Sequence, residues 1–216
     1  MHQYTIEGAN AGIRQKVTVI QIVISIIICT LINLAIDNFG ILDIGYISAV
    51  NGFFKQWPFF GFSFGYISMF LVFKIIDWLF DKYIWKMKPF NRLLRIPDFS
   101  GIWKGILMSS YDNGTKIHME ADITQTWKNI SIICKFSKSM SGSNSAIINC
   151  NSSKGKKLQF TYNNESQDPA ADQSMHIGVC ELYLSATPGD QSQELIGTYY
   201  NNRGGGNKGS IKLKKE

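Results

Sequence analysis

The sequence contains little of what catalysis or metal binding needs. Its three histidines, His2, His118 and His176, lie far apart in the chain, and its four cysteines form no C-x-x-C pair, so a zinc site is not expected. It has no G-x-S-x-G or Walker A motif, and no G-x-G-x-x-G motif between a strand and a helix. We therefore expect no enzymatic activity, no metal and no cofactor. The cysteines are expected to be free thiols in a reducing compartment.

Two long apolar stretches occupy much of the first third of the chain. Val17–Ile36 comprises twenty residues without a charge, and at about 1.5 Å per residue its helix matches a hydrocarbon core of roughly 30 Å. Trp57–Phe73 comprises seventeen residues, and it lengthens past Lys74 if that cation lies at the membrane surface. We expect a helical hairpin over residues 17–80, with transmembrane spans at about 17–36 and 57–76.

The positive charges predict the orientation of this hairpin. Arg14 and Lys16 precede the first span and six cations lie within residues 74–95, whereas the connecting loop, Asp37–Gln56, carries only Lys55. By the positive-inside rule both termini and the C-terminal domain are cytoplasmic. Residues 1–96 carry +4 of the net charge of +6. This concentration beside the spans favours contact with lipid headgroups over binding of DNA or RNA.

Changes in composition indicate the remaining boundaries. Residues 1–16 are predicted to form a short cytoplasmic tail. Residues 81–96 alternate aromatic and basic side chains, and we expect a juxtamembrane linker that lies among the headgroups. From residue 97 onward the apolar positions recur with period two, so residues 97–216 are predicted to form one cytoplasmic β domain.

Lys116–Trp127 is the clearest strand, because apolar and polar residues alternate along the segment. Similar alternation predicts about eight short strands, over residues 102–110, 116–127, 130–136, 146–150, 158–162, 178–184, 195–199 and 211–213. No helical period interrupts them, so we expect antiparallel pairing. Eight such strands suit a small, closed, lipocalin-like β-barrel that can hold one ligand. A two-sheet sandwich is the alternative.

A run of alternating serines extends over the segment FSKSMSGSNSA. If this segment is extended, Ser137, Ser139, Ser141, Ser143 and Ser145 line one face, where their hydroxyls could donate to the phosphates or base edges of a ligand. Richness in Ser, Gly and Asn is also typical of a flexible connection, and composition alone favours that interpretation.

Further candidate residues lie at predicted strand ends. Arg203 follows a strand and precedes a Gly-rich turn, so at a barrel rim it could clamp a phosphate while a neighbouring tyrosine stacks on a base. Aromatic residues at such positions are more commonly core or rim residues. The candidate ligand-binding residues are Arg203, Tyr199, Tyr200, Gln125, Trp127, Ser141, Ser143 and Thr124.

The order of these parts carries a family resemblance. The short basic tail and the two spans are followed by Gly101-x-Trp103-x-Gly105, Ile123-Thr124-Gln125-Thr126-Trp127, the serine run and Leu195-x-Gly197-x-Tyr199-Tyr200-x-x-Arg203. With these features the chain resembles, over nearly its whole length, the two-transmembrane β-strand-rich effectors of bacterial CBASS anti-phage defence systems. The Gly-x-Trp start also looks like the opening strand of lipocalin-type barrels.

The resemblance implies a specific function. In that family an eight-strand barrel binds a cyclic dinucleotide made by a cognate nucleotidyltransferase after phage infection. Binding drives homo-oligomerisation of the membrane-bound effector, and the assembled spans disrupt the bacterial inner membrane and kill the cell before phage mature. For this chain it implies a multi-pass inner-membrane protein that binds a cyclic dinucleotide. Gly61-x-x-x-Gly65 in the second span has the spacing of a helix-packing motif.

Two other functions are compatible with the same residues. The aliphatic positions Ile117, Met119 and Ile123 share the predicted interior face, and together with the Gly-x-Trp start they also suit a membrane-tethered carrier of an apolar ligand. A structural subunit that only anchors a protein complex would bind no small molecule.

Overall fold

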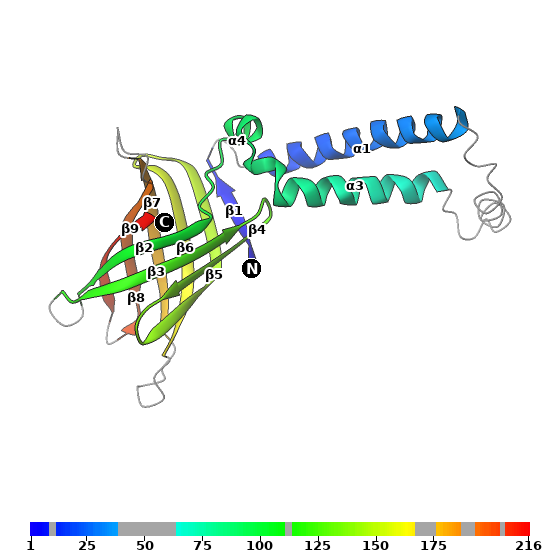
Figure 1. Cartoon of the computed structure of the whole chain (residues 1–216). Coiled ribbons are helices and arrows are strands. Elements are labelled where there is room, and N and C mark those ends of the chain that lie inside the picture. Colours follow the sequence, from blue (N-terminus) through cyan, green and yellow to red (C-terminus); the bar gives the residue numbers. More distant parts are fainter. Residues whose placement is uncertain (9–11, 39–63, 111–113, 167–175, 187–192, 204–205) are drawn as a thin grey trace. The chain divides into compact units, whose positions relative to one another are not determined.

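The computed structural model describes residues 1–8, 12–38, 64–110, 114–166, 176–186, 193–203 and 206–216. The chain divides into two compact units (Figure 1). One unit, Gly12–Ile84, is helical, and the other combines Met1–Ala11 with Trp85–Glu216 around a β-sheet. The helical unit is therefore an insertion between the first strand of the sheet and all the others.

In the described part of the helical unit, two helices pack against each other, α1 (Ile13–Asn38) and α3 (Phe64–Lys82). In α1, Thr18, Ser25 and Thr30 each donate a side-chain hydrogen bond to the carbonyl four residues earlier, at 3.0, 2.6 and 2.9 Å. These hydroxyls are satisfied within the helix, so the surface of α1 can remain apolar.

Among the described residues, one helical segment is long and apolar enough to cross a membrane, Ile13–Ile32 of α1. The second predicted span does not reach the same composition where it is described, because α3 carries four charged residues among nineteen, including Lys74 and Asp77 near its middle. Residues 39–63, which include the predicted loop, Gly61 and the start of the second span, lie outside the described part of the chain.

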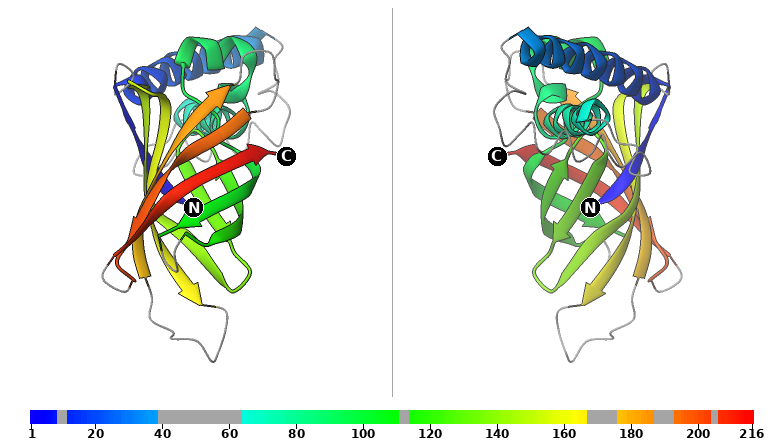
Figure 2. Two further views of the ribbon diagram at one scale, coloured as in Figure 1. Left: turned by 90° about the vertical axis from the view of Figure 1, so that its left-hand side faces the viewer. Right: turned by 90° about the vertical axis from the view of Figure 1, so that its right-hand side faces the viewer.

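The other unit is a nine-stranded sheet that closes on itself as a barrel (Figure 1 and Figure 2). Its strands are β1 (His2–Glu7), β2 (Gly101–Ser109), β3 (Lys116–Gln125), β4 (Asn129–Lys135), β5 (Ser139–Ser152), β6 (Gly155–Ser166), β7 (His176–Ala186), β8 (Gln193–Asn201) and β9 (Asn207–Lys215). Their order around the barrel is β1-β4-β3-β2-β9-β8-β7-β6-β5. All pairs are antiparallel except β1–β5, which is parallel.

Each of the eight predicted strands overlaps one of β2–β9, so the prediction of an all-β domain is confirmed. Burial alternates as the period of two requires: along β3, Met119, Ala121 and Ile123 are buried. The serine run is extended from Ser139 onward, within β5. The flexible connection that composition favours is therefore wrong for Ser139–Ser145, because neighbouring strands satisfy the backbone of this polar segment.

The first strand is the main departure from the prediction, since it lies within the sixteen residues expected to form a tail. β4 and β5 pair with each other only through Ile133–Lys135 and Met140–Gly142. β1 pairs with both strands away from this contact, and it runs parallel to Ala146–Asn149 of β5. Its side chains Tyr4 and Ile6 are only 2% and 5% exposed. The barrel therefore has nine strands instead of eight, and it does not begin at residue 97.

Aromatic side chains fill the interior at the end of the barrel where β2 begins and β3 ends, here called the Trp103 end. Trp103 is fully buried, and its Nε1–H donates to the carbonyl of Phe99 at 2.9 Å. The rings of Trp85 and Trp127 pack with their centroids 6.3 Å apart. Trp85 belongs to the short helix η3 (Ile84–Lys86), which α4 (Lys88–Leu94) follows. These side chains occupy the space that a ligand would need at this end.

Candidate functional site

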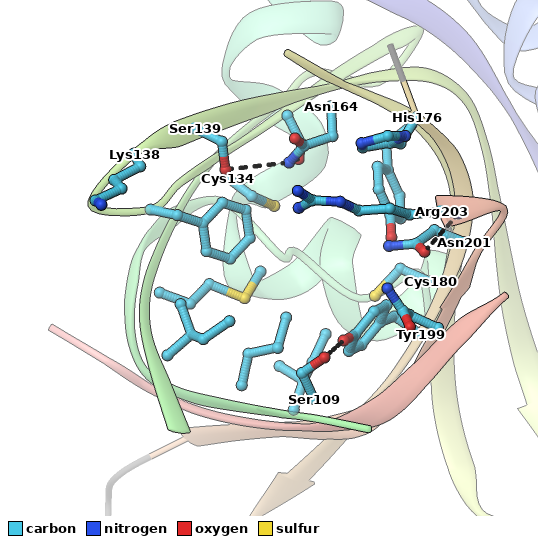
Figure 3. A pocket seen from close by; sticks show the side chains of 18 of the residues that line it. Ser109, Cys134, Lys138, Ser139, Asn164, His176, Cys180, Tyr199, Asn201 and Arg203 are labelled. Carbon is cyan, nitrogen blue, oxygen red and sulfur yellow. Dashed lines mark hydrogen bonds between the residues drawn. The ribbon is translucent and has the colours of Figure 1, made fainter. Parts of the chain in front are cut away.

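A cavity of about 500 Å³ opens at the other end of the barrel, here called the pocket end (Figure 3). Its lining residues come from the ends of β2, β4, β6 and β8 and from the beginnings of β3, β5, β7 and β9. Antiparallel pairing brings these termini to one edge, although they are far apart in the sequence. The volume lies within the range of about 300–1,000 Å³ that is typical of small-molecule sites.

Part of the cavity wall is apolar. The apolar and thiol side chains in it are Leu107, Ile117, Met119, Cys134, Phe136, Phe160, Cys180 and Ile211. A wall of this kind suits flat or apolar parts of a ligand, and it leaves orientation to a few polar groups. The uncharged polar side chains are Ser109, Thr115, Ser137, Ser139, Ser141, Tyr162, Asn164, Tyr199, Asn201 and Asn207.

Three basic residues also line the cavity, Lys138, His176 and Arg203. Figure 3 shows the Arg203 side chain pointing into the cavity, with Asn164 and His176 beside it. Of the described residues in the lining, none is Asp or Glu. This part of the lining is therefore electropositive, which favours an anionic ligand.

Hydrogen bonds order the side of the cavity that β8 forms. The hydroxyl of Tyr199 donates to Ser109 Oγ at 2.8 Å, which ties β8 to the end of β2. Asn201 Oδ1 accepts a hydrogen bond from the backbone N–H of Arg203 at 3.2 Å. This bond fixes the chain direction just after β8, and thereby the position from which the Arg203 side chain extends.

Two tyrosines of the cavity lie over glycines of neighbouring strands. Tyr162 is the cross-strand partner of Gly178, and Tyr199 is the partner of Gly209. A Cβ at Gly178 would overlap the Tyr162 ring, and one at Gly209 would lie 2.7 Å from the Tyr199 ring. The rings occupy the space that the glycines leave. Burial raises the pKa of the Tyr162 hydroxyl, which therefore stays protonated at neutral pH and can donate a hydrogen bond.

Three of the eight predicted site residues meet at this cavity: Arg203, Tyr199 and Ser141. They combine a cation, an aromatic ring and a hydroxyl in one space. These are the groups that the sequence argument assigns to phosphate clamping, base stacking and hydrogen bonding.

Gln125, Trp127 and Thr124 do not reach the cavity. β3 lines it with Ile117 and Met119, whereas Gln125 ends the same strand about 20 Å beyond Met119 at roughly 3.3 Å per residue. The Gln125 side chain is buried at the Trp103 end, where its Oε1 accepts from the backbone N–H of Phe99 at 2.8 Å. Trp127 is buried at the same end, and Thr124 is exposed. The candidate site is corrected accordingly, because alternation indicates a face of the strand but not a position along it.

Tyr200 and Ser143 also lie outside the cavity lining. Tyr200 follows Tyr199 on β8, so it points to the opposite face and is 55% exposed. Ser143 lies at a register shift in the β5–β6 pairing. Its hydroxyl accepts from the backbone N–H of Ile132 at 3.0 Å and hydrogen-bonds His2 Nε2 at 2.8 Å. Ser143 therefore holds β1, β4 and β5 together. It stays in register with Tyr162, but its hydroxyl is engaged by these two hydrogen bonds, and it is not among the residues that line the cavity.

Several lining residues are absent from the sequence prediction. Asn201 lies between Tyr199 and Arg203 at period two, so extending that alternation would have identified it. Asn164 and His176 are cross-strand partners on β6 and β7. No sequence signal indicates that pairing, because nine residues between the two strands carry no turn signature that fixes the register.

Burial suppresses the reactivity of two thiols in the cavity wall. It raises the pKa of the Cys134 thiol to about 12 and that of Cys180 well above its ordinary value. Since the thiolate is the nucleophile, we expect iodoacetamide at pH 7.5 to modify both far more slowly than the half-buried Cys150. Alkylation of Cys134 should rise about tenfold per pH unit up to at least pH 9.5, as followed by peptide mass spectrometry. A plateau near pH 9 would contradict this assignment.

Among the described residues, no three His, Cys, Asp or Glu side chains converge to hold a metal ion. A search of curated protein sequences finds no match to the chain. A family model described as "Cap15, cyclic dinucleotide receptor domain" matches residues 94–215, which include β2–β9 and the whole cavity lining. The match covers more than half of the chain. It supports the resemblance to CBASS effectors in its receptor part, and the chain belongs to the family of the Cap15 cyclic dinucleotide receptor domain.

Proposed function

We propose that this protein is a membrane-bound CBASS effector whose barrel binds a cyclic dinucleotide in the cavity at the pocket end. The observation that carries the proposal is the cavity itself. Its volume is about 500 Å³. Three basic residues line it, and none of the described lining residues is Asp or Glu. It lies inside the segment that matches the receptor family.

The chemistry of the lining fits the parts of such a ligand. A cyclic dinucleotide carries two phosphate charges, and Arg203 supplies a cationic donor that points into the cavity, with Lys138 at the rim and the His176 ring beside Arg203. It also carries two flat bases, which can stack on the rings of Tyr162 and Tyr199 while the polar side chains contact their edges. The binding role needs no catalytic group, and we propose that the chain is not an enzyme.

The downstream steps belong to the same proposal. A cognate nucleotidyltransferase supplies the ligand, and ligand-bound copies associate through the helical unit and disrupt the bacterial inner membrane. Both termini lie on the cytoplasmic side. The apolar segment Ile13–Ile32 supports insertion by its length and composition. A single pair of helices cannot enclose a pore, so the proposal requires several copies.

A ligand titration on the full-length protein in detergent tests the receptor function. The full chain is needed because β1 is part of the barrel. A ligand at a hundredfold its dissociation constant adds about 2.7 kcal/mol of stability. We expect one cyclic dinucleotide of a panel to raise the melting temperature, while linear dinucleotides do not. No shift with any cyclic dinucleotide would contradict the proposal.

Replacing Arg203 tests the assignment of the phosphate clamp. Arg203→Ala should weaken binding of the stabilising cyclic dinucleotide roughly 10- to 100-fold, because a hydrogen bond to a charged group contributes about 1.5–3 kcal/mol. Isothermal calorimetry on the full-length protein measures the change. Arg92→Ala is the matched control, since Arg92 is an exposed arginine of α4 outside the cavity lining. Equal affinities in the two variants would remove Arg203 from the site.

The apolar wall favours one second candidate, a carrier of an apolar ligand. Four residues of the lining have side chains without oxygen or nitrogen atoms: Leu107, Ile117, Met119 and Ile211. Fatty acids in the same titration panel distinguish the two functions. Stabilisation by a fatty acid but by no cyclic dinucleotide would favour the carrier.

A further inference from the structure

We propose that Asn164 determines base specificity, because the serines beside it hold its amide so that the carbonyl Oδ1 accepts a hydrogen bond from the exocyclic amino group of one ligand base. The inference rests on the proposed function. It assigns Asn164, which the sequence prediction does not include, as the residue that distinguishes an amino-bearing base from one that lacks the amino group.

Asn164 lies near the end of β6 and lines the cavity, and its cross-strand neighbours are Ser141 on β5 and His176 on β7. Its side chain is half-buried, so it faces the cavity without being exposed to bulk water on every side. Figure 3 shows Asn164 next to Ser139, Arg203 and His176 at the same side of the cavity.

The nitrogen end of the Asn164 amide is already bound within the protein. Asn164 Nδ2 donates to Ser141 Oγ at 2.8 Å and lies 3.4 Å from Ser139 Oγ. An amide nitrogen has two hydrogens, and these two serines take both. Among the described residues, Oδ1 has no hydrogen-bond partner. The group that Asn164 presents to a ligand is therefore an acceptor.

A second asparagine of the cavity has its amide held the opposite way. Asn201 Oδ1 accepts from the backbone N–H of Arg203 at 3.2 Å. Its carbonyl already has a partner, so Asn201 offers the ligand mainly the donor end of its amide. The cavity thus presents an acceptor on β6 and a donor on β8, which is an asymmetric pair.

The consequence for the ligand follows from base chemistry. Adenine, cytosine and guanine carry exocyclic amino donors, whereas the only donor on the base edge of uracil is its ring N3–H, which lies between two carbonyl acceptors that would repel Oδ1. If the bound base lacks the amino group, Asn164 Oδ1 is left without a hydrogen-bond partner. An acceptor that is buried by the ligand and left unpaired is unfavourable. Asn164 should therefore reject uracil at the base position that it contacts.

The test uses the full-length protein and the tightest-binding member of a panel of cyclic dinucleotides built from A, C, G and U in all pairs. This member is then compared with two analogues, each lacking the exocyclic amino group of one base. We expect one analogue to bind roughly 3- to 10-fold more weakly, as loss of one hydrogen bond predicts. In Asn164→Ala the same two ligands should bind equally.

Two further variants separate specificity from a structural role. Ser141→Ala should reduce the preference between ligand and analogue while leaving Asn164 in place, because the amide is then free to turn. Asn163→Ala, at the preceding residue of β6 and outside the cavity lining, should keep the preference unchanged. Unliganded melting temperatures show whether each variant is folded.

The outcomes are distinct. The inference would be overturned if cyclic diuridylate were the tightest binder. It would also be overturned if the analogue still bound more weakly than the ligand in Asn164→Ala. In both cases the receptor function stands. If no cyclic dinucleotide of the panel binds, the proposed function is overturned, and this inference with it. A penalty that disappears in Asn164→Ala, becomes smaller in Ser141→Ala and persists in the control variant would establish it.

Discussion

Trp103→Ala is expected to lower the free energy of unfolding of the barrel by about 3–5 kcal/mol, the usual range for removal of a large buried aromatic residue. Trp103 is fully buried, donates its indole N–H to the Phe99 carbonyl at 2.9 Å, and has Lys215 Nζ 5.3 Å from its ring centroid. Alanine would leave a cavity and an unpaired carbonyl at the Trp103 end, and the neighbouring strands cannot collapse into it without breaking their pairing.

The measurement is the thermal unfolding midpoint of the full-length protein in detergent, which should fall by roughly 6–20 °C. Ile102→Ala is the matched control, because Ile102 is the preceding residue of β2 and faces outward, 42% exposed. Its effect should stay within about 0.5 kcal/mol. Similar losses in the two variants would mean that Trp103 does not support the closed end. Ligand affinity, measured below the melting transition, should change little, since the cavity lies at the other end.

Removal of His2–Glu7 is expected to be about as destabilising, although these residues look like a tail in the sequence. Tyr4 and Ile6 are 2% and 5% exposed, and burying side chains of this size contributes about 1.5–3 kcal/mol each. Tyr4 also donates its hydroxyl hydrogen bond to the Thr126 carbonyl at 3.2 Å. The deletion would further expose unpaired backbone groups along β4 and β5, which promotes aggregation.

Hydrogen exchange of the full-length and shortened proteins measures this effect locally. Amides of Ala146–Asn149 in β5, which pair with β1, should lose protection when the strand is absent. Thr5→Ala is the control, because Thr5 lies on the same strand with its side chain exposed. Unchanged protection in the deletion variant would show that β1 is not needed to close the barrel.

Much of the β domain could be predicted because its strands alternate cleanly. Segments such as Lys116–Gln125 carry several apolar residues at period two, and each such run became a strand. β1 has the same pattern, but only Tyr4 and Ile6 mark it. Two alternating residues before a long apolar helix do not indicate a strand, and its partners lie more than a hundred residues away.

The site was harder to predict than the fold, and for a related reason. Periodicity gives the face of a strand, whereas a site needs the end of the strand as well. Gln125 and Ile117 share the inward face of β3, yet only Ile117 reaches the cavity. Ser141 and Ser143 share a predicted face too, but the Ser143 hydroxyl hydrogen-bonds Ile132 and His2, and Ser143 does not line the cavity. Arg203 and Tyr199 were identified because they stand at the end of the last-but-one strand, where the turn residues mark the rim.

The place of β1 in the barrel restricts how the chain can meet a membrane. β1 and β2–β9 belong to one folded unit, so the chain must leave the barrel after Glu7 and return to it at Trp85 on the same side of any bilayer. A path that starts and ends on one side crosses an even number of times. If Ile13–Ile32 crosses, an odd total is forbidden, and a return crossing must occur before Trp85. In a membrane-bound form of the chain, the six-residue strand β1 would thus determine whether the number of crossings is even or odd.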